Sequence, residues 1–155
     1  MIKRIFKNIA RIMVVAFVTF FTVSVCQTIR VRISYENQLE TYGQTATVNG
    51  AEIFYREAGS LSDPTVVMVH GFMGSSYDFI NVIDSIKDNY HVIAVDLVGF
   101  GLSEKSTTFE YYKDNQAEMV VALLEQKGID SYTLLGHSMG GEVALHIAYA
   151  YPSRV

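Results

Sequence analysis

The hydrophobic pattern divides the chain into a long apolar run near its amino end and a mixed region after it. The run extends from Ile12 to about Ile29, and a helix of that length spans roughly 27 Å, close to the ~30 Å hydrocarbon core of a bilayer. Four basic residues precede the run and two follow it, all within residues 1–32. The pattern therefore predicts a membrane anchor over residues 1–32, with a transmembrane helix at about residues 12–29.

Three other interpretations of this run are open. A cleaved signal peptide has the same basic start and apolar centre, although no Ala-x-Ala site follows here and only Ser24 and Cys26 are small enough for a poor one. A lipid-modified Cys26 is disfavoured by the bulky Val25 before it. A buried core helix fits neither the length nor the flanking charges. The excess of bases before the run favours a cytoplasmic amino end and an extracytoplasmic location for the rest of the chain. If the run were instead a cleaved signal peptide, the rest of the chain would be secreted.

The pattern after residue 32 changes twice. Residues 33–46 are polar and mixed, which predicts a linker, and residues 47–155 form the expected domain. Within "ATVNGAEIFYREAG" an Asn-Gly pair separates two strand-like runs, which indicates a hairpin. The continuous apolar runs "TVVMVHG", "HVIAVDL" and "SYTLLGHS" are typical of strands covered on both faces. Helical periodicity lies between and after them, in segments that end near Gly128 and Pro152, so we expect a mostly parallel α/β sheet with flanking helices.

Charge and cysteine content narrow the partners. The net charge is −4, but residues 1–32 carry six bases and no acid, and the remaining six bases and sixteen acids give the rest of the chain −10. An acidic domain argues against nucleic acid, whose phosphates need a basic surface. The single Cys26 excludes an internal disulfide and a cysteine metal cluster. The pair Gly99 and Gly101 lacks the third glycine of a dinucleotide site, which argues against a dinucleotide cofactor. We expect neither a cofactor nor a metal.

The candidate chemistry centres on "GHSMGG", residues 136–141. This G-x-S-x-G pattern ends an apolar strand and opens an amphipathic helix, which is the setting of a nucleophile elbow. Ser138 is the expected nucleophile, exposed at the carboxyl edge of the sheet, and His137 is expected to pack beside it and point away. We expect Gly136 and Gly140 to remove side chains that would collide across the turn, and Gly141 to let the helix pack closely on the sheet.

Two glycine-bearing loops follow the earlier strands. "VHGFMGSS" contains His70, Gly71 and Gly74 in a turn that can aim a backbone N–H at an oxyanion. The N–H groups of Phe72 and Met139 are the expected donors. His70 is expected to shape this turn rather than act as a base.

The other loop, "DLVGFGLS", begins with Asp96, which we interpret as a carboxylate that stabilises its own loop and not as a catalytic acid. The aromatic pair Tyr111 and Tyr112 further on is a candidate substrate wall, but core packing is the favoured interpretation.

These three motifs, in this order, resemble the α/β-hydrolase superfamily over about Val48 to Val155. The resemblance implies a serine nucleophile at Ser138, as in its esterase and lipase-like branches. The dehalogenase and epoxide-hydrolase branches carry aspartate at that position and are disfavoured. The anchor before the domain is similar to membrane-bound lipase-like members.

The partners of the nucleophile are the main gap. In this superfamily the order is Ser, then Asp or Glu, then His, but the only acid after Ser138 is Glu142 and the only histidine is His146. His146 is eight residues along the expected helix, roughly 12 Å away along its axis, whereas a base must approach within about 3 Å. His91 opens a strand and so lies at the opposite edge. We therefore expect an amino-terminal part of the domain, truncated after the elbow helix, with the elbow strand at an open edge.

Two functional hypotheses follow. The first is a serine hydrolase of small-molecule ester or lipid substrates that works through an acyl-enzyme, with this chain inactive by itself. The second is a non-catalytic, membrane-tethered protein that uses a hydrolase scaffold for binding, or a decayed gene product. The substrate and the oligomeric state have no signal in this sequence.

Overall fold

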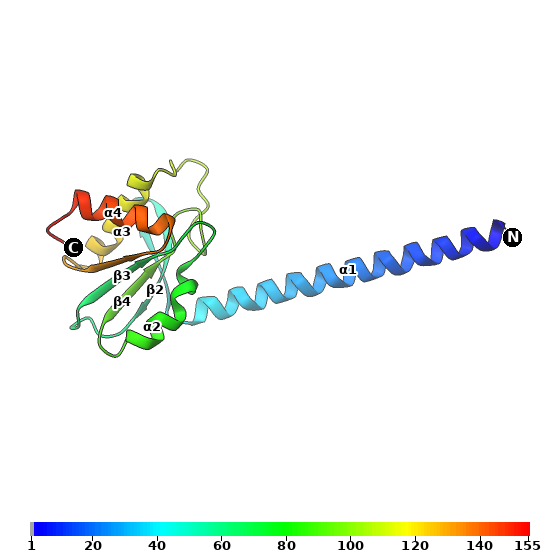
Figure 1. The fold of residues 1–155 in the computed structure, drawn as a ribbon, viewed down its shortest axis with the longest axis horizontal. Coiled ribbons are helices and arrows are strands. Elements are labelled where there is room, and N and C mark those ends of the chain that lie inside the picture. The colour runs from blue at the N-terminus through cyan, green and yellow to red at the C-terminus, as the bar shows by residue number, and fades with distance from the viewer. Residues whose placement is uncertain (1) are drawn as a thin grey trace. The chain divides into compact units, whose positions relative to one another are not determined.

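The computed structural model describes residues 2–155, with side chains described for residue 8, residues 11–30 and residues 41–155. The chain forms two compact units that divide after Glu40. The first is the helix α1, Ile2–Glu40. The second, from Thr41 onward, contains a five-stranded sheet with helices on its faces (Figure 1).

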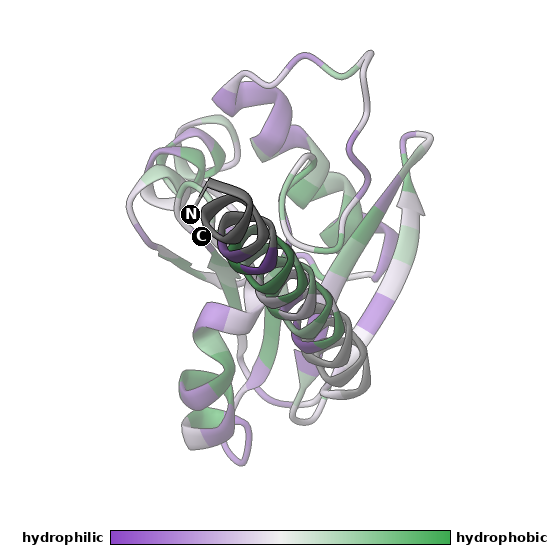
Figure 2. Ribbon diagram, turned by 90° about the vertical axis from the view of Figure 1, so that its right-hand side faces the viewer, coloured by the Kyte–Doolittle hydropathy of each residue, from purple (hydrophilic) through white to green (hydrophobic). Residues whose placement is uncertain are grey.

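Helix α1 contains one candidate membrane span. The segment Arg11–Arg30 has a mean hydropathy of 2.1 and is long and apolar enough to cross a bilayer. Its middle is coloured mostly hydrophobic in Figure 2. Three hydroxyls inside this segment donate to carbonyls one turn earlier, in the pairs Thr19–Val15 at 2.8 Å, Thr22–Val18 at 2.7 Å and Thr28–Ser24 at 3.0 Å. Such bonds suit hydrocarbon, because they leave no hydroxyl proton without an acceptor.

The expected linker over residues 33–46 is not what the structure shows. Helix α1 continues to Glu40 and the first strand begins at Gly43, so only Thr41 and Tyr42 separate the two elements. The physical reason is that residues 31–40 contain no glycine or proline and end in the good helix formers "ENQLE". Polar composition alone cannot separate a linker from a solvated helix.

The sheet has the strand order β1-β2-β4-β3-β5. Strands β1 (Gly43–Val48) and β2 (Ala51–Ala58) form an antiparallel hairpin, with positive φ at Asn49 (48°) and Gly50 (86°) as a tight primed turn requires. Strand β2 pairs antiparallel with β4 (His91–Val95), and β4, β3 (Thr65–Val69) and β5 (Thr133–Gly136) are parallel. The Asn-Gly hairpin and the three parallel strands confirm the sequence predictions. Strand β5 lies at an edge of this sheet, as expected.

Helices cover both faces of the sheet, because alternate strand residues point to opposite sides. On one face α3 (Lys113–Gln126) and α4 (Met139–Ala150) pack on the strands (Figure 1). This core includes the fully buried Val67, Ile93, Leu123, Val143 and Ile147. On the other face lie the 3-10 helix η1 (Ser76–Phe79) and α2 (Ile80–Ile86), where Phe79 and Ile83 pack on Met68 and Ala94. The α/β architecture with flanking helices is therefore confirmed.

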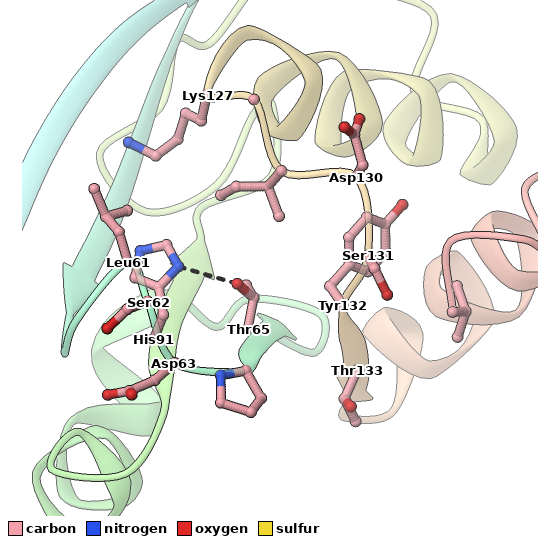
Figure 3. Close-up of a pocket in the computed structure, with 14 residues that line it drawn as sticks. Leu61, Ser62, Asp63, Thr65, His91, Lys127, Asp130, Ser131, Tyr132 and Thr133 are labelled. Carbon is pink, nitrogen blue, oxygen red and sulfur yellow. Dashed lines mark hydrogen bonds between the residues drawn. The ribbon is translucent and has the colours of Figure 1, made fainter.

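A polar cluster lies at the amino ends of the parallel strands, opposite the edge where the elbow lies. It lines a cavity of about 720 Å³, shown in Figure 3. The ring of buried His91 bonds Glu57 at 2.8 Å through Nε2 and Thr65 at 3.1 Å through Nδ1, and the Lys127 ammonium donates to Glu57 at 2.9 Å. Burial by itself would raise the pKa of Glu57, but the hydrogen bonds from Lys127 and His91 outweigh it and lower that pKa.

This cluster predicts an acid-dependent contribution to stability. Because the pKa of Glu57 is lower in the folded chain than in the unfolded one, its contribution is present above the unfolded value of 4.5 and is lost as the pH falls through the folded value. Glu57→Gln should lower the free energy of unfolding at pH 7 by about 1–3 kcal/mol. It should also flatten the decline in stability below about pH 5. Urea unfolding of the full chain in detergent, followed by tyrosine fluorescence from pH 3 to 8, measures both effects, and an unchanged acid slope would contradict the assignment.

Candidate active site

Ser138 occupies a sharp turn between β5 and α4. Its backbone has φ 52° and ψ −118°, a conformation that costs a non-glycine residue about 1–3 kcal/mol. The residue is exposed, and Met139 after it is the first residue of α4. The turn thus presents the hydroxyl at the carboxyl edge of the sheet, where the loops after β3 and β4 also lie. This is the strand–turn–helix geometry predicted from the sequence.

Two glycines make the turn possible. A Cβ at Gly140 would lie 2.1 Å from the carbonyl oxygen of Val69 and 2.5 Å from that of His70. A Cβ at Gly136 would lie 2.5 Å from the carbonyl oxygen of Gly140, so no side chain fits at either position. The expectation for Gly141 is wrong, because a Cβ there would lie 3.6 Å from its nearest neighbour, an ordinary contact.

The loop after β3 forms a tight turn beside Ser138. The N–H of Gly74 donates to the carbonyl of Gly71 at 3.0 Å and closes the turn. A Cβ at Gly71 would lie only 3.3 Å from the Cβ of Ser138, and one at Gly74 would lie 2.4 Å from the carboxylate of Asp78. Met73 inside the turn has φ 58°, which the sequence did not indicate.

His70 holds this turn in place. Its side chain is fully buried, its Nε2 accepts from the N–H of Leu97 at 3.1 Å, and its Nδ1 therefore carries the proton and donates to the carbonyl of Gly71 at 2.8 Å. Both ring nitrogens are engaged, so His70 is not free to act as a base. These bonds are compatible with the expected role of His70 in shaping the turn.

Asp96 organises the loop after β4. Its carboxylate accepts from the N–H of Ser76 at 2.5 Å and from the N–H of Leu102 at 2.6 Å, and its carbonyl accepts from the Ser103 hydroxyl at 2.6 Å. The residue is 1% exposed, and Gly101 approaches it so closely that a Cβ there would lie 1.9 Å from Oδ2. These bonds are compatible with the expected loop-stabilising role of Asp96, and the bond to Ser76 connects the segments that follow β3 and β4.

The two expected oxyanion donors lie at one cavity. Phe72 and Met139 both line a space of about 300 Å³, whose other walls include Phe100, Tyr111 and Gln116. Met139 begins α4, so its N–H has no acceptor within the helix. Among the described residues no hydrogen bond uses the N–H of Phe72 or of Met139. Both N–H groups are therefore without an acceptor among the described residues, and Met139 directly follows Ser138 in the chain.

The structure corrects one expectation, and the cavity wall also contains residues that the sequence did not assign to a site. Tyr111 and Tyr112 are exposed rather than packed in the core, and Tyr111 lines the cavity. Buried Gln116 bonds the N–H and carbonyl of Val98 at 3.1 and 2.8 Å and so fixes the loop that carries Phe100. The aromatic pair before α3 was a usable sequence signal for the wall, whereas nothing in the pattern indicated Gln116.

No described histidine is placed as a base for Ser138. His137 is exposed and its Nδ1 lies against Gly71. His146 is exposed on α4, eight residues after the serine, and His91 lies at the opposite edge of the sheet, bonded to Glu57. Among residues 2–155 no hydrogen bond joins the Ser138 hydroxyl to a histidine, and no group of three potential metal ligands is found.

Known proteins share this arrangement. A family profile described as "alpha/beta hydrolase fold" matches residues 64–155. The uncharacterized hydrolase YugF of Bacillus subtilis is 42% identical over 106 residues, which are 68% of this chain and 39% of YugF. The chain thus spans about two fifths of the length of that curated relative.

Two solved structures are similar over less than half of their own length. A bacterial membrane phospholipase A, described as a novel virulence factor, superposes with a TM-score of 0.73 and 30% identity over 99% of this chain and 49% of its own. Haloalkane dehalogenase DbeA from Bradyrhizobium elkanii gives a TM-score of 0.69 and 34% identity over 73% of this chain and 38% of its own.

The elbow geometry predicts different outcomes at neighbouring glycines. Gly140→Ala places a Cβ against two backbone carbonyls that cannot move aside, so we expect a loss of about 1–3 kcal/mol in the free energy of unfolding. Gly141→Ala is the matched control, because its Cβ meets only ordinary contacts and alanine favours the helix by up to about 1 kcal/mol. Urea unfolding midpoints of the two variants compare them, and an equal effect at both positions would contradict the described packing.

Proposed function

Because this chain belongs to the alpha/beta hydrolase fold family, we propose that it carries the nucleophile and the oxyanion donors of a serine hydrolase that acts on carboxylic-ester or lipid substrates. The observation that carries the proposal is the conformation of Ser138. A non-glycine residue with φ 52° persists only where its surroundings impose this conformation. Here the close backbone packing at Gly136 and Gly140, where no side chain fits, imposes it. The exposed hydroxyl then lies beside two N–H groups without acceptors.

The proposed reaction is acyl transfer through the serine. The Ser138 oxygen attacks the substrate carbonyl carbon, and the carbonyl π electrons move to its oxygen, which the N–H groups of Phe72 and Met139 stabilise. The Ser138 proton passes to a general base that residues 1–155 do not supply, and the base returns this proton to the alcohol oxygen when the tetrahedral intermediate collapses. The bond to the alcohol then breaks and an acyl-serine remains. Water then attacks the acyl group and regenerates the serine. These steps need neither a metal nor a cofactor.

In this proposal, residues 1–155 do not supply the general base that accepts the Ser138 proton. A serine hydroxyl is a weak nucleophile without one. The described histidines are bonded elsewhere or lie away from Ser138. We therefore propose that this chain alone does not turn over esters.

A non-catalytic binding function is the second candidate, and this lack of a placed histidine is the observation that favours it. The dehalogenase similarity does not favour alkyl halides as substrates, because the dehalogenase branch uses aspartate where this chain has Ser138.

External imidazole provides a direct test of the proposed half-site. We expect tens of millimolar imidazole to accelerate labelling of Ser138 by a fluorophosphonate by about tenfold or more, since it replaces the missing general base. Mass spectrometry of the labelled peptide is the measurement, and Ser138→Ala is the control. No labelling with imidazole would favour the binding candidate, and fast labelling without imidazole would show that the chain already supplies a base.

The proposed location is a membrane with the amino end in the cytoplasm and the domain on the far side. It is supported by the candidate span Arg11–Arg30 and by the excess of bases before it. In a Cys26→Ser background, we expect a membrane-impermeant maleimide to label Leu61→Cys in intact spheroplasts and to label Asn8→Cys only after lysis. The reverse order would contradict the orientation, and a mature chain lacking the first residues would establish signal cleavage.

A further inference from the structure

Four apolar side chains are exposed at the edge of the sheet that carries Ser138. They are Phe72 (70% exposed), Met73 (83%), Tyr111 (44%) and Tyr112 (66%), and they are called the apolar rim below. Large apolar side chains gathered on a surface, rather than scattered singly, indicate an interaction site.

The rim residues come from two separate loops that meet at one cavity. Phe72 and Tyr111 both line the space of about 300 Å³ beside Met139. The Phe72 ring also packs edge-on against Phe100, with 6.0 Å between the ring centroids. Met73 directly follows Phe72, and Tyr112 directly follows Tyr111. The two loops therefore meet at the cavity through Phe72 and Tyr111, and each of these residues is followed by a second exposed apolar side chain.

The turn that carries Phe72 and Met73 includes an unfavourable backbone conformation. Met73 is the most exposed of them and has φ 58°, a left-handed conformation that disfavours a side chain by about 1–2 kcal/mol. Phe72 belongs to the same turn, which the buried His70 and the Gly74–Gly71 bond hold rigidly. The apolar tip is consequently presented to solvent by an ordered turn.

We infer that the apolar rim is a lipid-contacting surface that enters the interface of the bilayer. The candidate span ends at Arg30, and only ten helical residues follow before α1 ends at Glu40, so the sheet begins within roughly 15–20 Å of that span along the chain. A domain tethered so closely meets the lipid surface at high local concentration. Tyrosine, phenylalanine and methionine side chains are suited to the boundary between headgroups and acyl chains.

The charge of the domain specifies the kind of lipid surface. Residues 33–155 carry sixteen acids and six bases, so an anionic membrane repels them. Lys105 and Lys113 line the cavity beside the rim, but the acids of the whole domain outnumber its bases by ten. We therefore expect contact through the rim to depend on burial of apolar area, with zwitterionic lipid as the partner. This inference rests on the membrane location proposed above, and it does not depend on the chemistry proposed for Ser138.

Site-specific fluorescence quenching tests the inference in the full chain. In a Cys26→Ser background, single cysteines at the rim positions Met73 and Tyr112 carry an environment-sensitive NBD probe, and the protein is reconstituted in phosphatidylcholine vesicles. The controls carry the probe at Leu61, which is 77% exposed at the opposite cavity of Figure 3, and at Tyr149, which is 90% exposed on α4. All four positions are exposed, so the substitutions leave the core intact.

Brominated lipids should quench the two rim probes by about twofold or more, as expected for side chains that enter roughly 5–10 Å into the interface, and should leave both control probes unchanged. Replacing part of the phosphatidylcholine with phosphatidylglycerol should weaken the quenching. Rim probes that stay unquenched overturn the inference, whether they remain in water or become shielded by protein. Equal quenching at all four positions, or stronger quenching on anionic vesicles, overturns it as well.

Discussion

The rest of the candidate site depends on the close approach between the first turn of α4 and the end of β3. Gly140 lies so near the carbonyls of Val69 and His70 that any side chain there would overlap them. This contact limits how α4 can begin, and the chain enters α4 from β5 through Ser138, whose φ is positive. The same contact brings the turn at Gly71 against Ser138, so one packing constraint sets both the strained serine and its neighbours.

Around this constraint, polar and apolar roles are divided between side chains of the same loops. Buried His70 and Asp96 use their hydrogen bonds to link the loops after β3 and β4 to each other. Because those bonds fix the backbone, the N–H of Phe72 stays free for a ligand and the side chains of Phe72 and Tyr111 stay at the surface. Buried polar contacts thus fix the backbone of the loops whose exposed aromatic side chains line the cavity.

Much of this arrangement could be predicted from the sequence because local chemistry decides it. The Asn49-Gly50 pair permits positive φ and formed the hairpin, and continuous apolar runs formed the parallel strands that need burial on both faces. Residues 33–46 were expected to form a linker, whereas helix α1 continues to Glu40 and β1 begins at Gly43, because a polar composition alone does not distinguish a linker from a helix. The exposure of Tyr111 and the bonds of Gln116 were also hidden, since both depend on contacts across the fold rather than on neighbouring residues. The motifs were a better guide to the candidate site than hydrophobic periodicity, because several of their glycines occupy positions where a side chain would overlap the backbone.

We propose that the N–H groups of Phe72 and Met139 together stabilise an oxyanion formed at Ser138. The most direct test is a crystal structure of the chain after its serine has reacted with a phosphonate, whose P–O oxygen stands in for the oxyanion. We expect this oxygen to lie about 2.7–3.1 Å from the backbone nitrogens of Phe72 and Met139. A phosphonate bound to Ser138 with that oxygen turned into solvent, away from both N–H groups, would contradict it.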